Sequence, residues 1–437
     1  MKRILMPAGL VALTWILDGS SCALAQTLPL ATTVASERDT DVAPSGFSGQ
    51  ALAVWRSDSR IRGEIRRSDG STVRSGVTVM EPFVASGWSY TYSAPAVTRI
   101  EDCPYDPANP CGFYVVAKRT ATHSTYGATS QIVGRYVSAG GDVSSVEQAL
   151  SGTTVPAYLP GRPDVAGGIV APGLLVVWTE GRNLMGRRAN SSGIPSGAPF
   201  VIHSASGVRV GPNPAVSFGR NQYFGGAGHV AAFTTTDDFG SARMLARFVS
   251  DTGPAPQPIW VAPISATGDV GDPDVTWEWW SISVGIVAWR DGRDVYATAL
   301  YDGTPVSVNV KVLATSEYLG RPAVSPTNVR GHFVLAFEQH SSPSAARDLR
   351  AIRLRATLQS TASYPPSYNL YAGAPMTLAN TTNNEQQAAV AWAGDRLLTT
   401  WESENPTALK DPWGGWLPAG ANVYLRSDAL SSFPYPY

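Results

Sequence analysis

Carboxylates and arginines recur in this sequence just behind short apolar runs. The pairs are Asp58 with Arg60, Glu180 with Arg182, and Asp291 with Arg293. Side chains of these types could together hold a sugar or an ion. Because a substrate breaks the symmetry of a repeated structure, catalytic groups are usually unique within it, whereas this pair occurs three times. We therefore interpret the pairs as ion pairs that fix turns, each contributing about 0 to 1 kcal/mol.

Polar residues that depart from the repeat are better candidates for a site. One set stands at the start of short valine-containing segments and comprises Asp41, Asp164, Asn213, Asp274 and Arg321. A second set follows the apolar runs and comprises Lys118, Arg119, His123, Glu338, Gln339, His340 and Glu402. The candidate ligand-binding residues that we select from both sets are Asp164, Asp274, Arg321, Glu338 and His340. The alternative is that all of them are solvated surface charges.

Other chemistries find little support in the sequence. The five histidines show neither His-x-His nor His-Glu-x-x-His spacing, so no metal site is expected. No Gly-x-Ser-x-Gly stands at a strand-to-helix turn, and no cofactor is implied. Catalytic residues are therefore not assigned. Two carboxylates at the distance that glycosidases use remain an open alternative, because a sequence does not give the distance between side chains.

Tryptophans outside the repeat form two further candidate sites. One group is Trp277, Trp279 and Trp280, and the other is Trp413 and Trp416 beside Gly414 and Gly415. Such residues suit stacking on sugar rings or contact with an apolar patch of a partner. The alternative is that they cap the hydrophobic layers of the fold. We expect the two groups to lie on opposite rims.

These residues sit within a repeat that runs through the chain. An apolar run occurs seven times, 48 to 64 residues apart, with its last residue at Trp55, Ala117, Trp178, Phe233, Trp289, Phe337 and Trp401. A valine-containing segment precedes each run, most often as Pro-Ala-Val or Pro-Asp-Val. A further strand and usually a glycine turn follow, since glycine supplies the positive φ that tight hairpins need. The blades of β-propellers repeat at about 40 to 50 residues, so this spacing with loop insertions predicts one blade per copy.

Four strands in each of seven copies predict an all-β fold, a seven-bladed β-propeller with four-stranded antiparallel blades. The seventh copy lacks a fourth strand after residues 423–426, whereas residues 28–35 form an additional strand before the first copy. We predict that this N-terminal strand completes the last blade and closes the ring, which also covers a sheet edge. In such a fold the polar residues lie on one rim and around the central channel.

The repeat also resembles that of a known group of proteins. Its cycle of Pro-(Ala/Asp)-Val, an apolar run ending in Val-Trp, an acid-x-Arg turn and a Gly-Arg strand resembles propeller-type repeats in large exported bacterial proteins of poorly known function. The resemblance covers nearly all of the mature chain and implies the fold rather than an activity. Sialidases also use propellers and carry Ser-x-Asp-x-Gly-x-Thr-Trp turns. Residues 68–73 miss that spacing and lack the tryptophan, so they do not match it.

Residues 1–25 have the pattern of a secretory signal peptide. Lys2 and Arg3 precede an apolar stretch at 4–17, and Ala23-Leu24-Ala25 offers a small-residue cleavage site. The apolar stretch is short of the ~20 residues that a membrane span needs. We therefore expect residues 26–437 to form a single propeller domain of a monomeric protein that is secreted, periplasmic or attached to the cell surface. Cys103 and Cys111 close a proline-rich loop, which is typical of a disulfide in an exported protein.

The amino-acid composition excludes some classes of binding partner. A net charge of -1 and 15% charged residues give no basic surface for nucleic acid or an anionic membrane. Recognition of a carbohydrate or a cell-surface protein, at the rim or in the channel, fits best. A glycoside hydrolase or polysaccharide lyase at the channel mouth is the competing class, and a purely structural surface propeller is the third.

Overall fold

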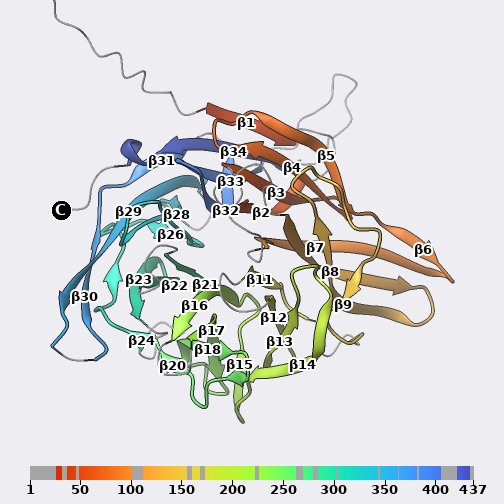
Figure 1. Cartoon of the computed structure of the whole chain (residues 1–437), viewed down its shortest axis with the longest axis horizontal. Helices are drawn as coiled ribbons and strands as arrows, with labels where there is room; N and C mark the ends of the chain where they lie inside the picture. Colours follow the sequence, from red (N-terminus) through yellow and green to blue (C-terminus); the bar gives the residue numbers. More distant parts are fainter. Residues whose placement is uncertain are drawn as a thin grey trace, which may run out of the picture.

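The computed structural model describes residues 26–31, 37–45, 49–100, 112–154, 160–167, 173–221, 226–261, 269–278, 284–301, 304–342, 345–362, 364–380, 383–404 and 421–433. Within these residues the strands form seven antiparallel sheets, arranged as the blades of a ring (Figure 1). The predicted seven-bladed β-propeller is therefore confirmed. No helix in these ranges has the length and apolar character to cross a membrane.

Each blade begins with its innermost strand beside the central channel. The first blade contains β2 (Glu37–Pro44), β3 (Gln50–Ser57), β4 (Arg60–Arg67) and β5 (Thr72–Met80). The second contains β7 (Trp88–Arg99), β8 (Phe113–His123), β9 (Gly127–Val137) and β10 (Gln148–Ala149), with β6 (Phe83–Ala85) paired to β7. The third contains β11 (Asp164–Gly167), β12 (Leu174–Glu180), β13 (Asn183–Ala189) and β14 (Pro195–His203).

The next three blades follow the same order but divide some strands into two pieces. The fourth contains β15 (Val208–Val210), β16 (Ala215–Asn221), β17 (Gly226–Asp237), β18 (Ala242–Ser250), β19 (Gly253–Pro254) and β20 (Ile259–Trp260). The fifth contains β21 (Val270–Trp277), β22 (Gly285–Asp291), β23 (Asp294–Tyr301), β24 (Thr304–Pro305) and β25 (Val310–Lys311). The sixth contains β26 (Tyr318–Leu319), β27 (Ala323–Pro326), β28 (His332–His340), β29 (Asp348–Ser360), β30 (Ser367–Ala372) and β31 (Met376–Ala379).

The last blade is built from both ends of the chain. It contains β32 (Asn384–Ala393), β33 (Arg396–Glu404), β34 (Ala421–Ala429) and, as its outer strand, β1 (Gln26–Ala31); a short helix, η3 (Leu430–Ser432), follows β34. β1 pairs antiparallel with β34, with Leu28 opposite Leu425 and Pro29 opposite Tyr424. The ring is therefore closed by the N-terminal strand, as the missing fourth strand of the seventh copy predicted.

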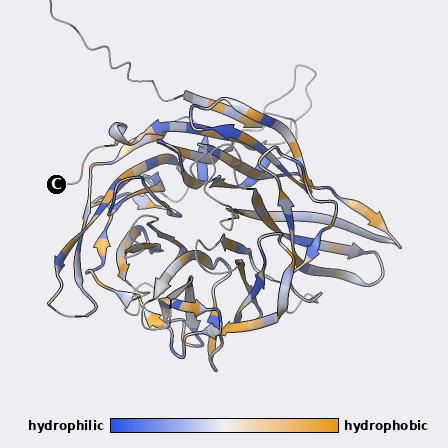
Figure 2. Ribbon diagram, viewed as in Figure 1, coloured by the Kyte–Doolittle hydropathy of each residue, from blue (hydrophilic) through white to orange (hydrophobic). Residues whose placement is uncertain are grey.

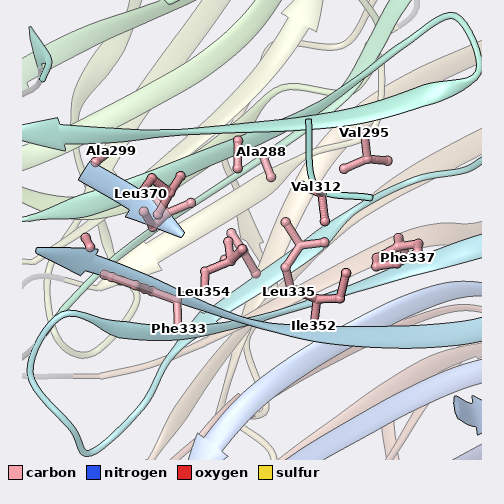
Figure 3. Close-up of a cluster of buried hydrophobic side chains, with 14 of the residues drawn as sticks. Ala288, Val295, Ala299, Val312, Phe333, Leu335, Phe337, Ile352, Leu354 and Leu370 are labelled. Carbon is pink, nitrogen blue, oxygen red and sulfur yellow. The ribbon is translucent and has the colours of Figure 1, made fainter. Parts of the chain in front are cut away.

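The hydrophobic core lies between neighbouring blades. Figure 3 shows such a layer, in which Ile352, Leu354 and Phe333 of the sixth blade pack against Ala288 and Ala299 of the fifth. The second strand of each blade has core on both faces, which explains why these strands read as continuous apolar runs rather than alternating ones. Figure 2 shows the same runs as hydrophobic colour on strands within the ring.

The arginines of the repeated turns contact residues of neighbouring segments. Arg60 pairs with Glu81 at 3.3 Å, and Arg182 pairs with Asp238 of the next blade at 3.4 Å. The guanidinium of Arg293 lies 5.5 Å from the centre of the Tyr318 ring. The three arginines thus connect each turn to a neighbouring segment. The turns themselves are two-residue hairpins whose first residue has positive φ, 52° at Asp58 and 62° at both Gly181 and Gly292.

Buried His229 on β17 makes the fold sensitive to acid. Burial, together with the nearby positive charge of Arg188, lowers the pKa of His229 to about 3. The unfolded chain takes up this proton near pH 6.5 and the folded chain only near pH 3, so stability is lost as pH falls from about 6.5 towards 3. We expect wild type to lose about 2 kcal/mol more than His229→Phe between pH 7.5 and pH 5.0, measured by denaturant unfolding. Wild type and His229→Phe share the raised carboxyl pKa values elsewhere in the protein, so the effects of those groups cancel in the comparison. An equal loss of stability at pH 5.0 in the two proteins would refute this role of His229.

Candidate functional site: the central channel

The inner strands bring the first set of sequence-predicted residues together at the central channel. The channel holds a cavity of about 210 Å³. Its polar lining includes Asp41, Arg162, Asp164, Asn213, Asp274 and Arg321, which lie in or just before the Asp-Val and Ala-Val pairs of the inner strands. A cavity needs only about 10 to 15 Å³ of such space for one water, so this one has room for several waters or a small polar ligand.

Bulges in the inner strands set the direction of the residues at the channel mouth. In four blades the residue two positions before the Asp-Val or Ala-Val pair has positive φ: Asp39 at 56°, Ala94 at 48°, Asp272 at 50° and Gln387 at 52°. The pairing with the second strand shifts register at each of these points. A bulge of this kind re-aims side chains and interrupts the ladder of hydrogen bonds, which is common beside binding sites.

Arginine occupies the equivalent position in the third and sixth blades, as Arg162 and Arg321. Each follows a glycine that permits a close approach. A Cβ on Gly161 would lie 2.5 Å from the carbonyl oxygen of Pro212, and a Cβ on Gly320 would lie 2.5 Å from Oε2 of Glu338. Glycine at both places thus leaves room for a close neighbour, which is a backbone carbonyl leading into the next blade at Gly161 and a side chain of the same blade at Gly320.

Aspartates of alternate blades hold the next blade by its backbone. In each case one Oδ2 accepts the N–H of the valine in the following Ala-Val segment: Asp41 from Val97 at 2.8 Å, Asp164 from Val216 at 2.7 Å and Asp274 from Val324 at 2.6 Å. The alternation of Asp-Val and Ala-Val in the first six copies therefore encodes contacts between blades. These bonds fix the carboxylates that face the channel.

The remaining junctions use other side chains. Thr98 accepts the N–H of Gly167 at 3.0 Å, and Asn213 donates to Asp272 at 3.0 Å. Glu338 accepts the N–H of Gln387 at 2.9 Å, and Glu402 accepts the N–H of Asp39 across the point of ring closure. Each neighbouring pair of blades is thus joined near the channel by at least one polar contact, which makes the mouth rigid.

Burial and mutual repulsion make the channel carboxyls hard to ionise. Burial, together with the negative charge of Asp41, raises the pKa of Asp164 to about 7. Burial also raises the pKa of Asp274 to about 6, against the opposing effect of the N–H that Val324 donates. Glu402, at the closure of the ring, has its pKa raised to about 7 by burial as well. At neutral pH the channel therefore carries less negative charge than its carboxyl groups suggest.

Two guanidinium groups balance these carboxyls. Burial lowers the pKa of Arg162, the nearby Arg321 lowers it further, and Asp41 acts in the opposite direction. Arginine nevertheless keeps its charge at neutral pH in proteins. Arg321 in turn lowers the pKa of Asp274. The channel is thus a nearly neutral mixture of fixed donors and acceptors.

The other sequence candidates lie outside this cavity or contribute differently. Glu338 is nine-tenths buried or more and pairs with Arg347 at 2.9 Å, so its carboxylate serves the junction between blades. His340 stacks on Tyr318, with ring centroids 5.3 Å apart, on the rim. Trp277 lines the channel wall but is only 3% exposed, and its ring fills the space above Gly285 and Gly219. The structure therefore supports the interpretation of Trp277 as part of the hydrophobic layer and corrects its proposed role in stacking.

Several candidates lie outside the described residues. They are Trp279, Trp280, Trp413, Trp416, Cys103 and Cys111. The signal peptide at 1–25 falls outside them as well.

Arg162 is the main channel residue that the sequence analysis missed. Its signal was present, because Gly161-Arg162-Pro163 repeats the Gly320-Arg321-Pro322 pattern that surrounds a selected candidate. Among the described residues, no cluster of three or more His, Cys, Asp or Glu side chains is arranged to hold a metal ion.

Comparisons with known proteins concern the fold. No protein-family model matches the sequence, and no curated protein does. The solved structure of a leech intramolecular trans-sialidase is similar, with a TM-score of 0.50 and 10% identity over 93% of this chain and 70% of that chain. A Trypanosoma rangeli sialidase has a TM-score of 0.46 and 13% identity over 92% of this chain and 57% of that chain. An endo-arabinase from Bacteroides thetaiotaomicron has a TM-score of 0.38 and 9% identity over 93% of this chain and 99% of that chain.

The match to the Trypanosoma rangeli protein spans little more than half of that protein's length. At 10% identity the likeness to the leech protein concerns the fold alone.

Proposed function

We propose that this protein is an exported β-propeller that binds a carbohydrate at the mouth of its central channel. The observation that carries the proposal is the polar cavity in which Arg162 and Arg321 face Asp41, Asp164 and Asp274. Fixed donors and acceptors in one cavity match the hydroxyl groups of a sugar, each of which both donates and accepts. Because the opposite charges nearly cancel, a ligand of low net charge fits better than a strongly charged one.

A second candidate function is hydrolysis of a glycosidic bond. It is favoured by the raised pKa of Asp164, about 7, since a carboxyl that stays protonated near neutral pH can act as a general acid. The hydrogen bonds that Asp164 and Asp274 accept from backbone N–H groups weigh against it, because they hold these carboxyls in an acceptor role. We therefore favour carbohydrate binding over hydrolysis as the function of the channel.

A glycan array followed by product analysis tests both functions. We expect the full-length mature protein to bind a saccharide of low net charge and to release no product from it on prolonged incubation. Cleavage of the bound glycan would replace the binding function by the hydrolase. Failure to bind any glycan would leave recognition of a protein or a purely structural role. Export itself is tested by N-terminal sequencing of protein collected outside the cytoplasm, which should begin at Gln26.

A further inference from the structure

An extension of the second blade carries aromatic side chains that the channel does not use. β6, the first half of β7 and the adjoining ends of β8 and β9 form a ribbon that projects beyond the ring (Figure 1). We call residues 83–92 and 120–130 the aromatic ribbon. β7 shifts register between Ser93 and Ala96, and only from Ala96 onwards does it line the channel. The ribbon thus begins at the rim where the inner strands start.

One face of the aromatic ribbon gathers five rings. Phe83 stands opposite Tyr90 and stacks on it, with centroids 4.2 Å apart and planes within 11°. Trp88 lies on the same face as Tyr90, because alternate residues of a strand share a face. The rings of Trp88 and Tyr126 are 6.4 Å apart and within 18° of parallel. His123 fills the corner between them, 5.1 Å from Trp88 and 4.7 Å from Tyr126.

These rings are open to solvent at the surface of the ribbon. Tyr126 is 74% exposed and Phe83 is 42% exposed, while Trp88, Tyr90 and His123 are half-buried. Figure 2 shows β6 at the tip in hydrophobic colour. Exposed aromatic rings gathered in one place usually mark a contact surface.

Polar contacts at the base hold the face in position. The guanidinium of Arg119 lies 5.4 Å from the centre of the Tyr90 ring and donates to both Glu147 and Gln131. The hydroxyl of Tyr92 donates to Glu147 at 2.8 Å. The platform is therefore ordered before any ligand arrives, which reduces the entropy lost on binding.

The composition of the ribbon points to the chemistry of its ligand. Residues 82–98 and 120–134 contain no Asp, Glu, Lys or Arg and are rich in Ser and Thr. The guanidinium of Arg119 at the base is paired with Glu147, so this surface does not suit nucleic acid or an anionic membrane, whose binding depends on Lys and Arg. Aromatic rings surrounded by hydroxyl groups suit a neutral ligand that has both apolar faces and hydroxyls.

We propose that the aromatic ribbon is a second binding site, and that it takes the chain of a neutral polysaccharide. The C–H faces of sugar rings would lie on Trp88 and Tyr126, and the hydroxyls of nearby Ser and Thr would bond the ring edges. The proposal does not rest on the channel, because the two sites share no residues. The aromatic ribbon binds the polysaccharide independently of any ligand in the channel.

Co-sedimentation of the full-length mature protein with polysaccharides tests this site. The probes are microcrystalline cellulose and insoluble mannan as neutral polymers, and polygalacturonate as an acidic one. We expect binding to at least one neutral polymer and none to polygalacturonate. Trp88→Ala combined with Tyr126→Ala should weaken binding at least about tenfold. Tyr126→Ala alone should weaken it several-fold while preserving the fold, since that side chain is 74% exposed.

Matched controls separate the ribbon from other surfaces. Phe239 is 96% exposed on the fourth blade, so Phe239→Ala should bind as wild type. Tyr126→Ala should bind the oligosaccharide of the channel as wild type, which distinguishes failure of this site from failure of the channel. The proposal is overturned if no neutral polymer binds or if the ribbon variants bind unchanged. Dimerisation that Tyr126→Ala abolishes, seen by light scattering, would overturn it in favour of a second copy of this chain.

Discussion

Replacing Arg162 and Arg321 together by methionine should weaken saccharide binding by the channel at least about 100-fold. Each guanidinium is a charged donor, and a hydrogen bond to a charged group contributes about 1.5 to 3 kcal/mol. Two such groups lost at once correspond to roughly two or more factors of ten in affinity. Methionine keeps much of the side-chain length, so the loss reports on hydrogen bonding rather than on the shape of the channel. Isothermal titration with a saccharide from the glycan array measures the effect.

The matched control for this pair lies on the outer rim. Arg182 is solvent-exposed in its pair with Asp238, so Arg182→Met should bind the saccharide as wild type. The double variant also leaves the channel aspartates without nearby positive charge, so its folding must be verified by thermal unfolding at pH 6, where these carboxyls protonate more readily. Unchanged affinity in a folded double variant would show that the ligand binds elsewhere.

Removing residues 26–31 should lower the free energy of unfolding by roughly 3 to 5 kcal/mol, from the partial burial of Leu28 and Leu30 and the hydrogen bonds to β34. Leu30 packs against Trp55 and against the core cluster that includes Val42 and Leu425. The truncated protein also exposes the edge of β34, which invites association with another strand. Denaturant unfolding and light scattering measure the two effects.

A pair of point variants separates this role from a general effect of changing the N-terminus. Leu30→Asp places a charge on the packed face of β1, whereas Thr27→Asp places one on its exposed face. Leu30→Asp should reproduce most of the loss of stability and Thr27→Asp little of it. Equal unfolding midpoints for these two variants and wild type would mean that β1 does not close the ring.

The sequence predicted the fold well because the residues of its repeat are the ones that pack in the core between blades. Runs such as residues 174–178 are buried on both faces in every blade, so they stay apolar and recognisable. The missing fourth strand of the last copy similarly required a partner, and the N-terminal segment was the one spare strand. Ring closure could therefore be predicted by counting strands.

The site was harder to predict because side chains of one type play different parts. Asp164 and Asp274 were selected as departures from the repeat, yet each also holds the next blade through a valine N–H. The sequence shows the alternation of Asp-Val with Ala-Val but not the bond that explains it. Trp277 looked accessible beside two further tryptophans, whereas its ring fills the space left by Gly285.

The aromatic ribbon shows what a repeat-based comparison overlooks. Trp88, Tyr90 and Tyr126 are separated along the chain and match no motif, so their grouping depends on strand register. The extension does not stand out in the repeat spacing, because the 62 residues from Trp55 to Ala117 also include the Cys103 to Cys111 loop. The absence of charge in both of its segments was the signal that could have identified it.

Direct location of a bound saccharide tests the central claim. A crystal structure of the mature protein with the tightest-binding oligosaccharide from the array should show that ligand at the channel mouth. The account predicts hydrogen bonds from its hydroxyls to Arg162 and Arg321 and to a carboxylate of Asp41, Asp164 or Asp274. A saccharide bound only on another surface, with the channel holding water alone, would contradict it.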